Sequence, residues 1–166
     1  MKGLKIFIAV LLIAGTAKAQ FIKADLQISG LNCALCAKKT AASLKALPFV
    51  SDVKPDPMHN SYSITFKNNQ AVNFDEIGKI VKEENFFVNS LTATFNFENV
   101  KVIDNYFSYG GDTYRIMNGP GKTLSGPVII TIVDKGLAPR SVSKKYLSQI
   151  ATTEPVKSGR LYHVAI

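Results

Sequence analysis

The chain contains few of the residues on which enzymatic chemistry usually depends. It has no tryptophan, two cysteines and two histidines among 166 residues. Neither histidine lies in a recognisable catalytic sequence context, so a nucleophile, a base and an oxyanion-binding group cannot be assembled from the sequence. We therefore expect a protein that is not an enzyme.

The sequence also lacks an apolar run long enough to span a membrane. Its longest run, Ile6 to Ala14, is about half of the roughly 20 residues that cross a bilayer. Lys2 and Lys5 precede the run and Ala17-Lys18-Ala19 follows it, which is the pattern of a secretory signal peptide. No cysteine lies near the cleavage point, so a lipid-modified N-terminus is not supported. The sequence predicts a signal peptide at residues 1–19 and a periplasmic or secreted protein.

Acidic residues are scarcer than basic ones, and the formal net charge is +8 at pH 7. Removal of residues 1–19 takes three lysines and no acid, so this charge falls by three to +5. The remaining excess is spread along the chain and forms no basic run. Together with export, this distribution argues against nucleic acid as a partner.

The hydrophobic pattern of residues 20–97 predicts a compact α+β unit. Ala24, Leu26 and Ile28 alternate with polar residues as in a strand, and from Ala37 the spacing becomes helical until Pro48 ends it. The expected order is then an edge strand from residue 50, a strand over 62–67, a helix over 73–85 and a strand over 91–97. Strand, helix, strand, strand, helix, strand is a split pair of crossover units, with both helices on one face of an antiparallel sheet.

Both cysteines lie between the first strand and the first helix, as Cys33 and Cys36. The expected position of Cys36 in the first helical turn favours its thiolate, and Lys38 and Lys39 add positive charge nearby. Soft thiolate ligands select Cu(I) or Zn(II) over magnesium or calcium. Zinc normally takes four ligands and this loop supplies two, which favours Cu(I) and leaves Zn(II) open if a partner or solvent completes the site.

The same cysteine pair could serve other purposes. A structural disulfide suits an exported protein, but closing so short a loop adds little stability. A thiol–disulfide redox protein is the main alternative, although the Trp-Cys-Gly-Pro-Cys surroundings of thioredoxin are missing. Haem attachment is excluded because Ala37 follows the pair where histidine would be needed.

The segment Gly30-Leu31-Asn32-Cys33-Ala34-Leu35-Cys36 resembles the Gly-Met-Thr-Cys-x-x-Cys loop of heavy-metal-associated (HMA) domains. These are the ferredoxin-like modules of copper chaperones and of the N-terminal regions of metal-pumping ATPases. The resemblance, from about Phe21 to Leu91, implies a ferredoxin-like fold, Cys33 and Cys36 as metal ligands, and Phe86 near the metal. It also implies a metal exporter or acceptor protein of the envelope as partner, so that contact with a membrane is only through that partner.

Three further motifs carry weaker signals. Met58 and His59 could assist the metal site, but we expect a surface turn because another strand separates theirs from the cysteine strand. His163 fits the exposed face of a last strand. The segment from Gly119 to Thr123 is similar to a phosphate loop but has Ile116 where the first glycine is required, so we expect a loop between strands.

Residues 98–166 are predicted to form a second, β-rich domain after an HMA-like domain at 20–97. A hairpin with a Gly110-Gly111 turn, a strand at 128–133 covered on both sides, a helix at 141–149 and a strand at 161–166 are expected. Such short strands indicate a small barrel or sandwich, with an OB-like arrangement as one form. This half resembles the C-terminal region of two-part exported HMA proteins, which assigns it no activity. The whole sequence predicts an exported protein that sequesters or transfers a soft metal ion.

Overall fold

The structure is a computed structural model that describes residues 19–31, 33–119, 124–150 and 159–166. The predicted signal peptide, except for its last residue, lies outside these ranges, as do Asn32 and most of the loop at 119–123. Within the described ranges, no helix is long and apolar enough to cross a membrane.

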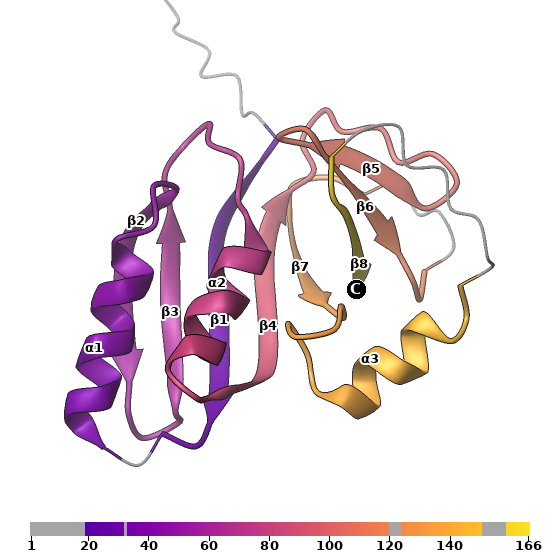
Figure 1. Ribbon diagram of the computed structural model, residues 1–166. Coiled ribbons are helices and arrows are strands. Elements are labelled where there is room, and N and C mark those ends of the chain that lie inside the picture. Colours follow the sequence, from indigo (N-terminus) through magenta and orange to yellow (C-terminus); the bar gives the residue numbers. More distant parts are fainter. Residues whose placement is uncertain (1–18, 32, 120–123, 151–158) are drawn as a thin grey trace, which may run out of the picture.

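The first half has the element order that the sequence predicts. The order is β1 (Gln20–Ser29), α1 (Ala34–Lys45), β2 (Val50–Asp56), β3 (Ser61–Phe66), α2 (Phe74–Glu83) and β4 (Phe87–Asn96). The strands pair antiparallel in the order β2-β3-β1-β4, and both helices lie on one face of this sheet (Figure 1). The predicted α+β, ferredoxin-like fold is thereby confirmed.

Local sequence signals account for several element ends. The side chain of Asn73 caps α2 by accepting a hydrogen bond from the backbone N–H of Glu76 at 3.3 Å. Pro55 lies in β2, which is an edge strand and therefore tolerates a residue without an N–H group. Helix α1 begins at Ala34, three residues earlier than its apolar spacing predicts, because the cysteine loop itself supplies the cap.

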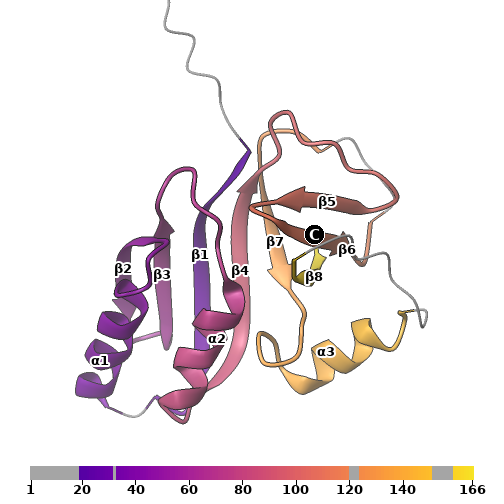
Figure 2. The ribbon, with the colours of Figure 1, turned by 45° about the horizontal axis from the view of Figure 1, so that its top comes forward.

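The C-terminal half continues the same sheet. Its elements are β5 (Tyr106–Tyr109), β6 (Asp112–Ile116), β7 (Pro127–Ile132), α3 (Arg140–Leu147) and β8 (Leu161–Ala165). Strand β7 pairs with β4, and the eight strands follow the order β2-β3-β1-β4-β7-β8-β6-β5. The OB-like arrangement is not confirmed, because the described strands of this half extend one sheet that runs through both halves (Figure 2).

An aromatic cluster joins the two halves. The ring of Phe21 lies 5.0 Å from that of Phe74, 4.7 Å from that of Phe95 and 5.4 Å from that of Tyr114. Tyr162, from the last strand, packs edge-on against Phe74 at 5.5 Å. Such ring pairs add about 0.5–1.5 kcal/mol each beyond the area they bury. The strands of the C-terminal half therefore share a core with β1, β4 and α2.

Strand β7 corrects one prediction. Residues 128–133 were expected to be covered on both sides, yet Ile129 is 63% exposed while Ile130 and Ile132 are fully buried. Only one face of the sheet is buried at this strand, so its side chains alternate between the core and solvent. A continuous apolar run is in this case a strand with one open face.

Candidate metal site

Cys33 begins α1 as its N-terminal cap. Its backbone is extended, with φ −149° and ψ 130°, and its Sγ atom accepts a hydrogen bond from the backbone N–H of Cys36 at 3.3 Å. The sulfur thus takes the place of the oxygen that Ser, Asp or Asn usually supplies at a helix start. Both cysteines are free thiols, Cys33 exposed and Cys36 partly buried. The predicted position of Cys36 in the first helical turn is correct.

The two thiols differ in acidity. The pKa of Cys33 is lowered, first by its hydrogen bond with the Cys36 side chain and then by the hydrogen bond from the Cys36 backbone N–H. The pKa of Cys36 is raised, first by its hydrogen bond with the Cys33 side chain, then by desolvation and by the negative charge of the Cys33 thiolate. The carboxylate of Glu84 makes a smaller contribution in the same direction. Cys33 is therefore the thiol that ionises first and the better nucleophile of the pair.

This difference predicts the order in which the thiols react. At neutral pH iodoacetamide should modify Cys33 before Cys36, and the pH at which the rate of modification is half-maximal should be lower for Cys33. Quenched time points analysed by peptide mass spectrometry give both rates. In urea the two rates should converge, because the hydrogen bonds at the helix start are lost. Faster modification of Cys36 in the folded protein would contradict the assignment.

Glycine and an aromatic residue shape the loop before the thiols. Gly30 has φ +93°, a conformation that side chains disfavour, and a Cβ atom there would lie 3.4 Å from Cδ1 of Phe86. Phe86 is therefore beside the loop, where the resemblance places it. Leu35, between the two cysteines, is 75% exposed, and Phe87, which pairs with Ser29 at the end of β1, is 74% exposed.

Two residues near the thiols were not identified from the sequence. Glu84, at the end of α2, accepts a charged hydrogen bond from Nζ of Lys39 at 3.0 Å, so one of the two expected lysine charges is already paired. Tyr62 is buried, and its hydroxyl donates to the carbonyl oxygen of Ala37 at 3.4 Å. Both contacts join segments distant in the sequence, and no local pattern indicates them.

The hairpin with Met58 and His59 lies at the same end of the sheet but forms a surface turn. The carbonyl oxygen of Asn60 accepts a hydrogen bond from the N–H of Ile28 at 3.0 Å, so the turn lies against β1. Met58 is 90% exposed, and Nδ1 of His59 lies 2.7 Å from a carboxylate oxygen of Asp56. Among the described residues, no three His, Cys, Asp or Glu side chains form a group that could hold a metal ion.

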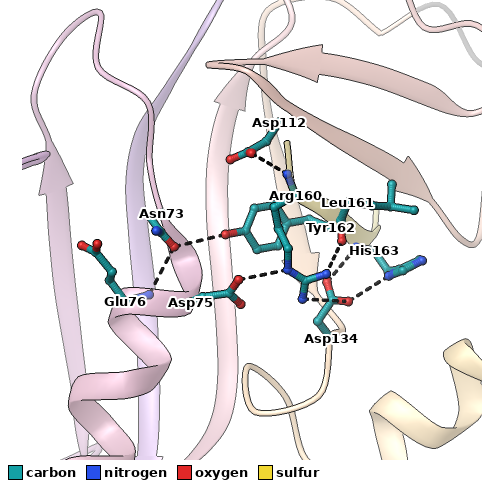
Figure 3. A network of polar contacts seen from close by, with 9 residues as sticks. All are labelled: Asn73, Asp75, Glu76, Asp112, Asp134, Arg160, Leu161, Tyr162 and His163. Carbon is teal, nitrogen blue, oxygen red and sulfur yellow. Dashed lines mark hydrogen bonds and ion pairs between the residues drawn. The ribbon is translucent and has the colours of Figure 1, made fainter. Parts of the chain in front are cut away.

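His163 was predicted on an exposed face, and this prediction is wrong. Its side chain is 8% exposed, and Nδ1 lies 2.8 Å from Oδ1 of Asp134, whose other oxygen accepts from the His163 backbone N–H at 2.7 Å (Figure 3). The partner Asp134 follows β7 and is itself buried, so the pair lies inside the protein. The sequence did contain a signal, because the other residues of Leu161–Ala165 are all apolar or aromatic and leave no polar face.

Arg160 extends this network to the first half of the chain. Its Nε atom donates to Asp75 of α2 at 2.9 Å, and its Nη2 atom lies 3.8 Å from Asp134 (Figure 3). The Tyr162 hydroxyl donates to Oδ1 of Asn73 at 3.3 Å, the atom that also caps α2. The network therefore ties the start of α2 to the last strand and lies apart from the thiols.

Comparison with known proteins matches residues 25–87 to the family model of the heavy-metal-associated domain. Among solved structures, a copper transporter domain of yeast, solved in apo and Cu(I)-loaded states, is 25% identical, covers 39% of this chain and 88% of its own, with a TM-score of 0.36. A putative copper-ion-binding protein from Bacillus anthracis is 19% identical, covering 43% of this chain and 97% of its own, with a TM-score of 0.36. The N-terminal domain of a zinc(II) ATPase is also 19% identical. It covers 42% of this chain and 64% of its own, with a TM-score of 0.36. A search of curated proteins found no match.

Proposed function

Because residues 25–87 form a heavy-metal-associated domain, we propose that this protein binds Cu(I) between Cys33 and Cys36 and sequesters the ion or passes it to a partner. The family match supports binding of a soft metal ion. The observation that carries the proposal is the pair of free thiols at the start of α1, held together by the hydrogen bond from the Cys36 N–H to the Cys33 sulfur.

The donor set fits Cu(I) better than Zn(II). Two thiolates are soft ligands, and among the described residues no third His, Cys, Asp or Glu joins them in a group. Zinc in a structural site takes four such ligands, so it would need two from outside this loop. Two thiolates around one Cu(I) leave a net charge of −1, which the backbone N–H groups at the start of α1 stabilise.

The position of the thiols suits transfer by ligand exchange. Cys33 is exposed, so a thiolate of an incoming protein could join the two resident sulfurs before one of them leaves. Each cysteine must lose its proton to bind the ion, and the lowered pKa of Cys33 favours this step. The role is not enzymatic. The predicted signal peptide would place it in the envelope, where a metal exporter or acceptor protein is the expected partner.

A competition titration with a colorimetric Cu(I) chelator tests this function. Reduced protein should withdraw one equivalent of Cu(I) from the chelator, and protein oxidised to the Cys33–Cys36 disulfide should withdraw none. A parallel titration with Zn(II) and a zinc indicator distinguishes the two ions. If the reduced protein competes for neither ion, the metal-binding function is wrong.

The unequal acidity of the thiols favours one second candidate, a thiol–disulfide redox protein. In this case the Cys33 thiolate attacks a substrate disulfide and forms a mixed disulfide, releasing one substrate thiolate. Cys36 then attacks the Cys33 sulfur and releases the second, so that the substrate gains two electrons and the protein keeps a disulfide. Rapid exchange with a disulfide substrate, together with weak binding of both metal ions, would favour this candidate over metal transfer.

A further inference from the structure

A cavity of about 1020 Å³ lies between the two halves of the molecule. One wall is α2 with the start of β4, and the other is the segment from β7 to α3 together with α3 itself (Figure 1). We call it the α2–α3 groove. Its lining includes the apolar side chains of Val81, Phe86, Phe87, Val88, Leu137 and Leu147.

Basic residues stand on both walls of the α2–α3 groove. Lys79 and Lys82 come from α2, and Lys135, Arg140 and Lys144 come from the opposite wall. The only acidic residue in the lining is Asp75, which already pairs with Arg160 at 2.9 Å. Apart from a 3.7 Å contact between Lys79 and Glu83, the described residues provide no carboxylate partner for these five cations.

The walls are held together by close packing at the base of the groove. A Cβ atom at Gly78 of α2 would lie 2.6 Å from Cδ2 of Leu137, so glycine allows this approach without a shift of the leucine side chain. On the opposite wall, the Ser143 hydroxyl donates to the carbonyl oxygen of Asp134 at 3.2 Å and fixes α3 to the end of β7. The groove is therefore a formed feature of the fold, and its two walls fix the backbone positions from which the five cationic side chains extend.

We propose that the α2–α3 groove binds an acidic segment of a partner protein that also carries apolar side chains. An apolar base between two basic walls complements a peptide whose apolar residues enter the groove and whose carboxylates lie along both sides. A membrane surface is less suitable, because it is flat and cannot reach a base that lies between two walls. The predicted signal peptide of the chain is basic and would be repelled.

The groove adjoins the candidate metal site but does not depend on it. Phe86 lines the groove and also lies against Gly30 of the cysteine loop. A segment bound in the groove would therefore hold its protein beside the thiols. Binding of the segment itself needs neither cysteine, so the proposal can be tested separately from metal binding.

The test measures fluorescence anisotropy of a labelled 14-residue peptide of Glu and Leu, with Leu at every third or fourth position, on metal-free, reduced protein. Wild-type protein should bind this probe, and K82E/R140E, which reverses one charge on each wall, should bind it at least about tenfold more weakly. The matched control K54E/K101E reverses two exposed lysines outside the groove and should bind as wild type does. Thermal melts verify that all three proteins are folded.

Two further probes separate the contributions of charge and of a lipid surface. A peptide with Gln in place of Glu should bind weakly to every variant, and rising salt should weaken binding of the acidic peptide. Equal binding by wild type and K82E/R140E, or equal losses in both double variants, would overturn the proposal. Binding to phosphatidylglycerol vesicles that depends on Lys82 and Arg140, without binding of the peptide, would also overturn it.

Discussion

Replacement of both cysteines in C33S/C36S should abolish Cu(I) binding while leaving the fold intact. Serine oxygens are hard, weakly ionised ligands, so we expect the affinity for Cu(I) to fall by at least about a thousandfold. Serine is among the preferred N-cap residues, and its hydroxyl oxygen would accept the hydrogen bond that Cys33 Sγ now accepts from the backbone N–H of residue 36. The chelator competition therefore measures loss of the ligands and not loss of α1.

The single variants supply the control. C33S keeps only the thiolate of Cys36, and C36S keeps only that of Cys33. Each variant should lose most of the affinity for Cu(I), because two thiolates are needed to hold the ion. Circular dichroism and the melting temperature should match those of the wild type for all three variants. Cu(I) binding by C33S/C36S close to that of the wild type would show that the ion is held elsewhere.

The second large effect is expected for D134A, far from the thiols. The carboxylate of Asp134 is 5% exposed. Its Oδ2 atom accepts a hydrogen bond from the His163 backbone N–H at 2.7 Å, and its Oδ1 atom lies 2.8 Å from Nδ1 of the His163 ring. Removing one member of such a buried polar pair lowers the stability of the fold by about 3 kcal/mol or more. His163 would remain buried, away from water, but without the carboxylate that now binds it. The free energy of unfolding from urea titration should fall by this amount.

D75A is the matched control for D134A. Asp75 also pairs with Arg160, at 2.9 Å, but its side chain is 47% exposed. Loss of a solvent-exposed ion pair should lower the free energy of unfolding by about 1 kcal/mol or less. If D75A and D134A destabilise the protein equally, burial of the His163 pair is not the source of the effect.

Elements with local signals could be predicted from the sequence. The Asn73 cap with Glu76 three residues later gives the start of α2, and the Gly110-Gly111 turn gives the β5–β6 hairpin. The cysteine spacing and its place between a strand and a helix were enough to find the candidate site. Whether Cys33 and Cys36 are the metal ligands stays a prediction, as does the division into domains at residue 97.

Features that depend on contacts between distant segments could not be predicted. Glu84 reaches Lys39 of α1 only because α1 and α2 pack side by side on the sheet. The burial of His163 requires Asp134, 29 residues earlier, and a place for β8 that no periodicity specifies. The α2–α3 groove likewise exists only because β7 pairs with β4 and brings α3 opposite α2.

The position of β8 has a consequence for how the chain folds. This strand lies between β7 and β6 and is buried along its whole length, parallel to one neighbour and antiparallel to the other. Until it arrives, the β5–β6 hairpin has no strand through which to join the rest of the sheet. The ferredoxin-like part can therefore assemble early, and β7 can add to β4 directly. The β5–β6 hairpin joins the sheet only once residues 161–165 are in place, and this long-range closure should be the slow step of folding.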